Sequence, residues 1–393
     1  MGNRNIRILY AVRLLGSLHF IGGVLIPFFT EWGHISEPMI PVIQLWFMWW
    51  AAFLEVPTGA VADYISRKAS VLLGFLISGL GFWIYVIGPH LAWFLIGEWL
   101  IALGVALVSG ADESILYDTL LEEGRPEEAT RISSRYGIVS MFGILVGSPL
   151  GSWVGVHWGL AVPHVLTGMA LVMSAVVALL LHEPSISSQT IDPAKRYRDV
   201  LSRGVKIFWS NKKVRLLGLN LALVHAISGT IIWLNQIALE DLSISPIWFG
   251  YVVSAGVMSE IILAHVIGDL EDRFGFRLIA VVTQIMPAVG FFLIVFGIFR
   301  GNIPIVLVGT MLPYSILIGR RSMLKAHINH HIPSSERATV LSTVELVRKG
   351  ITGGAYIIMS LTLGVGVWLP MTIFGCMLVM GLTIKTLNGQ GEP

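Results

Sequence analysis

The sequence predicts an all-α membrane protein with twelve transmembrane helices, arranged as two pseudo-symmetric halves of six. Of its 393 residues, 55% are hydrophobic and 13% are charged, whereas soluble domains carry about 25% charged residues. The apolar residues form runs of about 20, long enough for helices that cross a hydrocarbon core of about 30 Å. These runs are too continuous for the strands of a membrane barrel. A motif that recurs at a fixed offset predicts the two halves.

Each predicted helix corresponds to one apolar run. The first has a basic lead and no small-residue cleavage site, which favours an uncleaved helix over a signal peptide. The predicted spans are 8–29, 39–60, 69–88, 92–116, 133–156, 160–182, 215–238, 247–268, 278–298, 303–320, 340–361 and 365–385.

Basic residues fall mainly on one side of the predicted membrane. Of the 26 Lys and Arg residues, all but four lie at the termini or in loops after even-numbered spans. The exceptions are Arg300, on the opposite side, and Arg13, Arg348 and Lys349, inside spans. By the positive-inside rule both termini are predicted to be cytoplasmic.

A polar stretch from Glu183 to Lys213 divides the spans six and six. Its second half places Phe208 and Trp209 among basic residues, a pattern typical of an interfacial amphipathic helix. The predicted domains are 1–182 for the N-terminal six-helix bundle, 183–213 for the cytoplasmic linker and 214–393 for the C-terminal six-helix bundle.

An internal repeat connects the two halves. The stretch GAVADYISRK at 59–68 recurs as GDLEDRFGFR at 268–277, and ATRISS from Ala129 recurs as ATVLST from Ala338, both 209 residues later. Two matches at one offset predict parallel repeats of six helices. The aligned residues of the first match are Gly59 with Gly268, Asp63 with Asp272, and Lys68 with Arg277.

This repeated loop resembles the signature G-x-L-A-D-R-x-G-R-K of the major facilitator superfamily of secondary transporters, with departures at Tyr64 and Ser66. The resemblance implies twelve helices around a central cavity, with helices 3, 6, 9 and 12 facing lipid. It also implies a conformational role for eight residues. These are Gly59, Asp63, Arg67, Lys68, Gly268, Asp272, Arg273 and Arg277.

Two further stretches, FLEVPTGAVAD and GADESILYDTL, resemble a largely unassigned branch of bacterial permeases, which implies the cytoplasmic (inner) membrane of a bacterium. The stretch GILVGSPLGS at 143–152 is similar to the glycine-proline motif of antiporters. Its glycines equally suit close helix packing. The predicted function is export of a small organic solute by alternating access with proton coupling. The alternatives are an uptake symporter, a lipid flippase, and a receptor or scaffold that does not transport.

Three carboxylates inside spans are candidates for proton coupling: Glu260, Glu98 and Glu345. A charge at the middle of the bilayer costs about 2.5–3.5 kcal/mol on insertion scales, so each needs a partner, water or a function. Glu260 lies about 12 Å from the predicted cytoplasmic end of its helix and is the leading candidate. The alternative for all three is a structural ion pair or hydrogen bond.

Polar residues inside other spans are candidates for the substrate cavity. Glu345, Arg348 and Lys349 share one helix face by their spacing, which leaves one positive charge that could attract an anionic substrate or hold a distant carboxylate. The remaining polar residues could instead bond neighbouring helices. The full cavity set is Arg13, His225, Asn235, Gln236, Arg348 and Lys349.

Opposite charges occupy corresponding places in spans 4 and 10. Asp112 and Glu113 match Arg320 and Arg321 at an offset of 208. We expect either a cytoplasmic gate that closes by ion pairing or charges that mark the water interface.

The sequence contains no hydrolase, nucleotide-binding or zinc-protease motif, so no enzyme, catalytic residue or cofactor is predicted. A lone cysteine, Cys376, allows no disulfide within the chain. The HINHH stretch at 327–331 is assigned to a cytoplasmic loop without metal. The predicted partners are a small-molecule substrate, protons and the lipid bilayer; no nucleic acid and no obligate protein partner is predicted.

Overall fold

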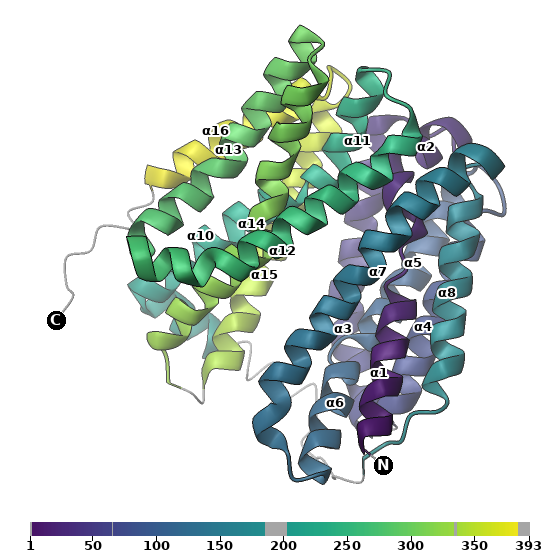
Figure 1. Ribbon diagram of the computed structural model, residues 1–393, viewed down its shortest axis with the longest axis vertical. Coiled ribbons are helices and arrows are strands. Elements are labelled where there is room, and N and C mark those ends of the chain that lie inside the picture. Colours follow the sequence, from purple (N-terminus) through teal and green to yellow (C-terminus); the bar gives the residue numbers. More distant parts are fainter. Residues whose placement is uncertain (1, 65, 185–202, 334–335, 384–393) are drawn as a thin grey trace. The chain divides into compact units, whose positions relative to one another are not determined.

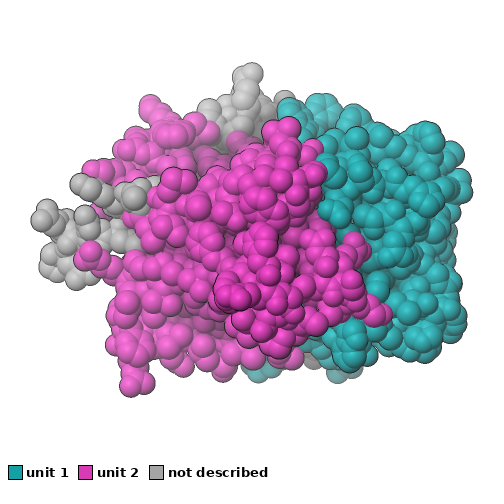
Figure 2. All heavy atoms as spheres, turned by 90° about the horizontal axis from the view of Figure 1, so that it is seen from above, with its two compact units in different colours: residues 1–197, 246–254 teal, residues 198–245, 255–393 magenta. Residues whose placement is uncertain are grey.

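The computed structural model describes residues 2–64, 66–184, 203–333 and 336–383, and the regular elements among them are helices (Figure 1). The chain divides into two compact units, coloured separately in Figure 2. Unit 1 comprises residues 1–197 and 246–254, and unit 2 comprises residues 198–245 and 255–393. The predicted domain boundaries at 182 and 213 stay a prediction, since residues 185–202 of the linker lie outside the described part.

Unit 1 contains a helix at each of the six predicted N-terminal spans. The fourth span is interrupted because Gly110 adopts a left-handed backbone with φ +78°, a conformation that glycine tolerates and other residues resist. The first span gives way to short turns after residue 16. The helices are α1 (Gly2–Gly16), α2 (Leu25–Pro27), α3 (Ile40–Tyr64), α4 (Arg67–Tyr85), α5 (Leu91–Val108), α6 (Ala111–Glu122), α7 (Ala129–Trp158) and α8 (Val162–Ala178).

Unit 2 holds the helices of the six C-terminal spans, although the first residues of α12 belong to unit 1. The seventh span is divided into two helices at Thr230. The helices are α10 (Lys212–Gly229), α11 (Ile231–Asp241), α12 (Phe249–Phe274), α13 (Phe276–Arg300), α14 (Ile303–His330), α15 (Arg337–Thr362) and α16 (Trp368–Met380).

Helix α14 continues to His330, well beyond the predicted end of its span at 320. The assignment of HINHH to a loop is therefore wrong for His327 and His330, which lie in the last turn of the helix. Hydropathy detects the part of a helix that crosses the hydrocarbon core, and this last part is too polar for that signal.

The described end of the predicted linker helix belongs to the core of unit 2. Residues 203–210 are helical, Phe208 is fully buried, and Trp209 is exposed. Phe208 packs beside Gly218 of α10, where an added side chain would collide with its ring. Its apolar face packs on protein through Phe208, and the predicted contact of the linker with the membrane surface stays a prediction.

Helix pairing repeats between the units. In unit 1, α4 packs against α5 and α8, and α1 packs against α7. In unit 2, α13 packs against α14 and α16, and α10 packs against α15. These are the corresponding spans of the two halves, as parallel repeats require.

Exposed apolar side chains follow one face of α13 at spacings of three and four residues, and α8 exposes Met169, Met173 and Val176 in the same way. Such a continuous apolar stripe suits contact with lipid. Eight helical stretches of the described chain are long and apolar enough to cross a membrane. The stripe on α13 consists of Leu278, Val282, Ile285, Val289, Phe292, Phe296 and Phe299.

Candidate functional site

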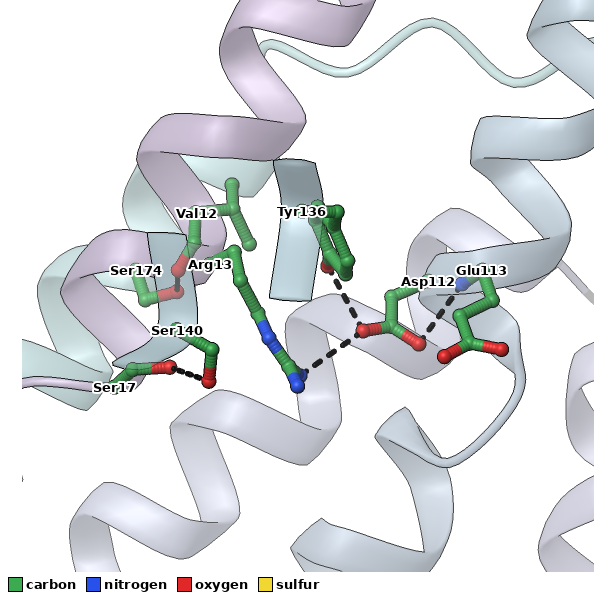
Figure 3. Close-up of polar contacts among 8 residues, drawn as sticks. All are labelled: Val12, Arg13, Ser17, Asp112, Glu113, Tyr136, Ser140 and Ser174. Atoms are coloured by element: carbon green, nitrogen blue, oxygen red, sulfur yellow. Dashed lines mark hydrogen bonds and ion pairs between the residues drawn. The ribbon is translucent and has the colours of Figure 1, made fainter. Parts of the chain in front are cut away.

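A buried carboxylate organises the polar interior of unit 1. Asp112, on the first turn of α6, is 4% exposed. Its Oδ2 accepts a hydrogen bond from the Tyr136 hydroxyl of α7 at 2.8 Å and lies 3.3 Å from Arg13 Nη1 of α1. Figure 3 shows Arg13 and Tyr136 pointing toward Asp112 from separate helices. The carboxylate therefore ties three helices of unit 1 together.

Arg13 balances this carboxylate and also lies over the Tyr136 ring, 5.0 Å from its centroid. Cations over aromatic faces gain about 0.5–2 kcal/mol. The Asp112 carboxylate also accepts the backbone N–H of Glu113 at 2.8 Å, whereas the Glu113 side chain is exposed. A cavity candidate, Arg13, and a gate candidate, Asp112, are thus partners within one unit. Their roles in substrate binding and gating stay predictions.

The same pair of positions is in contact in unit 2. At the 209-residue offset of the signature loop, one place beyond the pairing of Asp112 with Arg320 made above, residues 321 and 345 correspond to Asp112 and Tyr136. Arg321 Nη2 of α14 lies 2.6 Å from Glu345 Oε1 of α15. At these two positions the first half places an acid beside a phenol, and the second half places a base beside an acid.

Glu345 is shared among three cations. Besides Arg321, Lys325 Nζ lies 3.3 Å from Oε1, and Arg348 Nε lies 2.7 Å from Oε2. His225 of α10 lies close enough to interact electrostatically with this group. The structure therefore brings together two cavity candidates, one gate candidate and one proton-coupling candidate, and adds Lys325, which the sequence analysis missed. Lys349, the next residue after Arg348, also has an interaction partner.

Arg320, the other gate candidate, is 2% exposed inside unit 2. Its guanidinium donates to the backbone oxygen of Ala280 at 2.6 Å, to the Thr283 hydroxyl and to the Asn220 side-chain oxygen. Asn220 in turn donates to Gln284 at 2.7 Å. Among the described residues Arg320 has no carboxylate partner, so neutral acceptors alone hold this cation.

The two other proton-coupling candidates have different surroundings. Glu98 of α5 is 5% exposed, accepts a hydrogen bond from Gln44 at 2.7 Å, and is also bonded by Tyr85. Glu260 of α12 is half-buried. Among the described residues, no hydrogen bond or ion pair to Glu260 is found.

Tyr314 of α14 is the polar neighbour of Glu260, close enough for electrostatic interaction. Its hydroxyl accepts a 3.4 Å contact from Asn235 of α11. Asn235 and Gln236 are fully buried, and Asn235 Oδ1 has no hydrogen-bond partner in the described structure. These two cavity candidates therefore lie in the interior of unit 2, and their contact with a substrate stays a prediction.

The first copy of the signature loop is anchored within unit 1. Arg67 forms an ion pair with Asp118 of α6, and its backbone N–H donates to Glu183 at 2.6 Å. The Lys68 ammonium donates to the backbone oxygen of Leu179 at 2.7 Å. Asp63 falls outside the residues whose side chains the structure describes, and Gly59 has open space on its side-chain face. Asp118 and Glu183 were not predicted.

The second copy uses equivalent positions with different chemistry. Phe276 and His327 stand 209 residues after Arg67 and Asp118, and their ring centroids are 3.8 Å apart. His327 Nε2 also lies 2.5 Å from Glu271. Asp272 and Arg273 are exposed, and Arg273 lies over the Phe274 ring at 5.2 Å. Arg277 makes contacts of its own, and Gly268 has open space where a side chain would stand.

The glycines of residues 143–152 bring α7 against the interrupted first span. Side chains added at Gly143, Gly147 and Gly151 would collide with backbone atoms of residues 17–20. This is the close-packing role that the sequence allows for these glycines.

Within the described residues no group of three or more His, Cys, Asp or Glu side chains is placed to hold a metal ion. The three cations around Glu345 and the partnerless Glu260 are therefore the groups that we consider for chemistry.

The fold is similar to solved structures of transporters. A mutant of the nucleoside transporter NupG has a TM-score of 0.78 at 14% identity, with 99% of this chain and 100% of that chain covered. A mutant of the peptide transporter POT has a TM-score of 0.76 at 15% identity, with 97% of this chain and 93% of that chain covered. A D-xylose-proton symporter has a TM-score of 0.76 at 12% identity, with 98% of this chain and 97% of that chain covered.

Sequence comparison reaches the same group of proteins. No curated protein matches the chain. A family model described as the Major Facilitator Superfamily matches residues 12–353. The chain, a multi-pass membrane protein with the fold of a secondary transporter, belongs to the Major Facilitator Superfamily.

Proposed function

We propose that this protein is a proton-coupled secondary transporter that moves a small organic solute by alternating access. The observation that carries the proposal is Glu260, a carboxylate inside a membrane-spanning helix with no hydrogen bond or ion pair to the described residues. A charge at such a depth costs about 2.5–3.5 kcal/mol. Binding a proton removes that cost, and releasing it to water restores the charge.

The other two carboxylates are weaker candidates. Three cations surround Glu345 within 3.3 Å, so losing its charge would leave them without a counter-ion. Glu98 already accepts hydrogen bonds from Gln44 and Tyr85. Glu260 alone of the three can change protonation without breaking a contact found in the described structure.

The membrane potential provides a driving force for this exchange of protons. It supplies about 2.3 kcal/mol for each charge moved through 100 mV. A protein of similar fold with a solved structure is a D-xylose-proton symporter. That likeness supports coupling here as a hypothesis.

We place the protein in the cytoplasmic membrane of a bacterium, with both termini in the cytoplasm, because the basic residues gather in the even-numbered loops. Export is the proposed direction. Its support is the similarity of residues 143–152 to an antiporter motif. The aromatic row of Trp46, Trp50 and Trp99 on α3 and α5, with ring centroids 5.6 and 6.2 Å apart, suits an organic solute.

The test is the Glu260→Gln variant, reconstituted in proteoliposomes with a trapped pH-sensitive dye. We expect solute-dependent proton movement to be lost, while exchange of solute between equal concentrations continues. Glutamine has nearly the same shape and cannot exchange a proton.

Asp241→Asn is the matched control, since it neutralises an exposed carboxylate at the end of α11 in the same unit. It should transport protons as the unchanged protein does. If Glu260→Gln retains full coupling and the same pH dependence, Glu260 has no part in the mechanism.

A further inference from the structure

The group around Glu345 has more positive than negative charge. Arg321, Lys325 and Arg348 all lie within 3.3 Å of this one carboxylate. No other ion pair among the described residues of unit 2 involves these three cations. Two positive charges therefore remain without a counter-ion in this group.

This cationic group lies within long helices and is open on one side. Arg348 is about 17 Å from the start of α15, and the side chains of Arg321, Lys325 and Arg348 are 39%, 28% and 25% exposed. Arg348 lies inside the predicted span 340–361, where an uncompensated cation is costly against lipid tails, and Arg321 and Lys325 lie just past the predicted end of their span at 320. Their exposed side must face water or a ligand.

Two donors of this group are not fully satisfied. The Nε–H of Arg321 is buried and has no hydrogen-bond partner in the described structure. The ammonium of Lys325 approaches Glu345 at 3.3 Å, a longer contact than those of the two arginines. An anion with two or more oxygens matches such convergent donors, because guanidinium groups bind carboxylate and phosphate with paired hydrogen bonds.

We propose that Arg321, Lys325 and Arg348 form the binding site for an anionic group, a carboxylate or phosphate, of the transported solute. The inference rests on the proposed transport function and names its substrate class. Glu345 is the built-in counter-ion of this site. It holds the cations in place when the site is empty and competes with the solute for them.

Because Glu345 competes with the anion for the cations, removing a cation and removing the Glu345 charge should change anion affinity in opposite directions. Removing a cation removes an attraction, so anion affinity must fall. Removing the Glu345 charge removes the competitor and leaves three free cations, so anion affinity must rise. A purely structural role for Glu345 predicts the opposite, because its loss would then disorder the cations.

The test measures the dissociation constants of succinate, benzoate and inorganic phosphate by calorimetry, on the purified full chain in discs of neutral lipid. Glucose and choline serve as neutral and cationic probes. We expect Arg348→Gln and Lys325→Gln each to weaken binding of at least one anion about tenfold, as loss of a charge-assisted hydrogen bond does. Glu345→Gln should tighten it about tenfold. Thermal unfolding without ligand identifies any variant that fails to fold.

Arg300→Gln is the matched control. It removes one cation of unit 2 that lies over the Phe296 ring at the end of α13, and it should leave anion affinity unchanged. The inference is overturned if none of the anions binds, if Glu345→Gln weakens binding while the protein stays folded, or if binding appears only with anionic lipid in the discs. In that last case a lipid head group occupies the site. Proton-coupled transport of glucose or choline would also overturn it, yet leave the proposed function intact.

Discussion

The buried arginine of unit 2 gives a sharp prediction about stability. Arg320 is 2% exposed and is held by Asn220, Thr283 and a backbone oxygen, with no carboxylate partner among the described residues. Replacing Asn220 with Ala removes one acceptor and leaves the cation partly unpaired. Replacing Arg320 with Met removes the cation itself and keeps a chain of similar length.

The expected costs follow from the bonds lost. Asn220→Ala loses a charge-assisted hydrogen bond, about 2 kcal/mol, and the bond to Gln284, about 1 kcal/mol, so the total is about 3 kcal/mol. Arg320→Met loses three hydrogen bonds but also removes the desolvation penalty of a buried cation, which amounts to several kcal/mol. Its net cost should be about 1 kcal/mol. The arginine is therefore easier to remove than its partner.

The assay is the free energy of unfolding in mixed micelles, titrated with sodium dodecyl sulfate and followed by helical circular dichroism. Thr283→Val is the control. Its loss of unfolding free energy should lie between those of the other two variants, since it removes one hydroxyl acceptor without a large change in volume. If Arg320→Met destabilises the protein as much as Asn220→Ala or more, the desolvation penalty of the buried cation does not offset its hydrogen bonds. Transport by the stable Arg320→Met variant then tests the predicted gate role separately.

Two further predictions concern unit 1. Gly143→Ala should destabilise the protein by about 1–3 kcal/mol, because the new methyl group would stand 2.8 Å from backbone atoms of Ser17. Gly137→Ala, on the same helix with open space, should instead stabilise it by up to about 1 kcal/mol through better helix propensity; equal effects at both positions would rule out the packing argument. Tyr136→Phe should destabilise the protein by about 1.5 kcal/mol, because it loses the hydrogen bond to Asp112. The same unfolding titration measures all three variants. A cost below about 0.5 kcal/mol for Tyr136→Phe, the range of surface substitutions, would mean that this bond adds little.

The twelve helices were predictable because each crosses a hydrophobic layer, and about 20 apolar residues are a strong signal. The interruption at Gly110 was not. The equivalent residue, Gly319, lies inside the continuous helix α14, so a glycine at this position does not by itself interrupt a helix. Hydropathy is also silent on the polar last turns of α14, which place Lys325 beside Glu345.

The sequence marked most of the charged residues discussed here but not Lys325, and it did not reveal which residues pair with one another. Charges inside apolar spans marked Arg13, Asp112, Arg320, Glu345 and Arg348, since each is expensive in a membrane. Partner choice depends on packing between helices that are distant in sequence. The repeat offset held the missing signal, because contacts 112–136 and 321–345 and contacts 67–118 and 276–327 share it.

Proton-driven transport of a solute through this protein can be measured directly. The direct measurement is proteoliposomes with an imposed pH gradient and labelled succinate or benzoate, compared with vesicles that lack the protein. We expect accumulation of at least one anion beyond its equilibrium concentration, abolished by a protonophore and by Glu260→Gln. Flux that only equalises the concentrations and is unaffected by the pH gradient would rule out proton-driven transport.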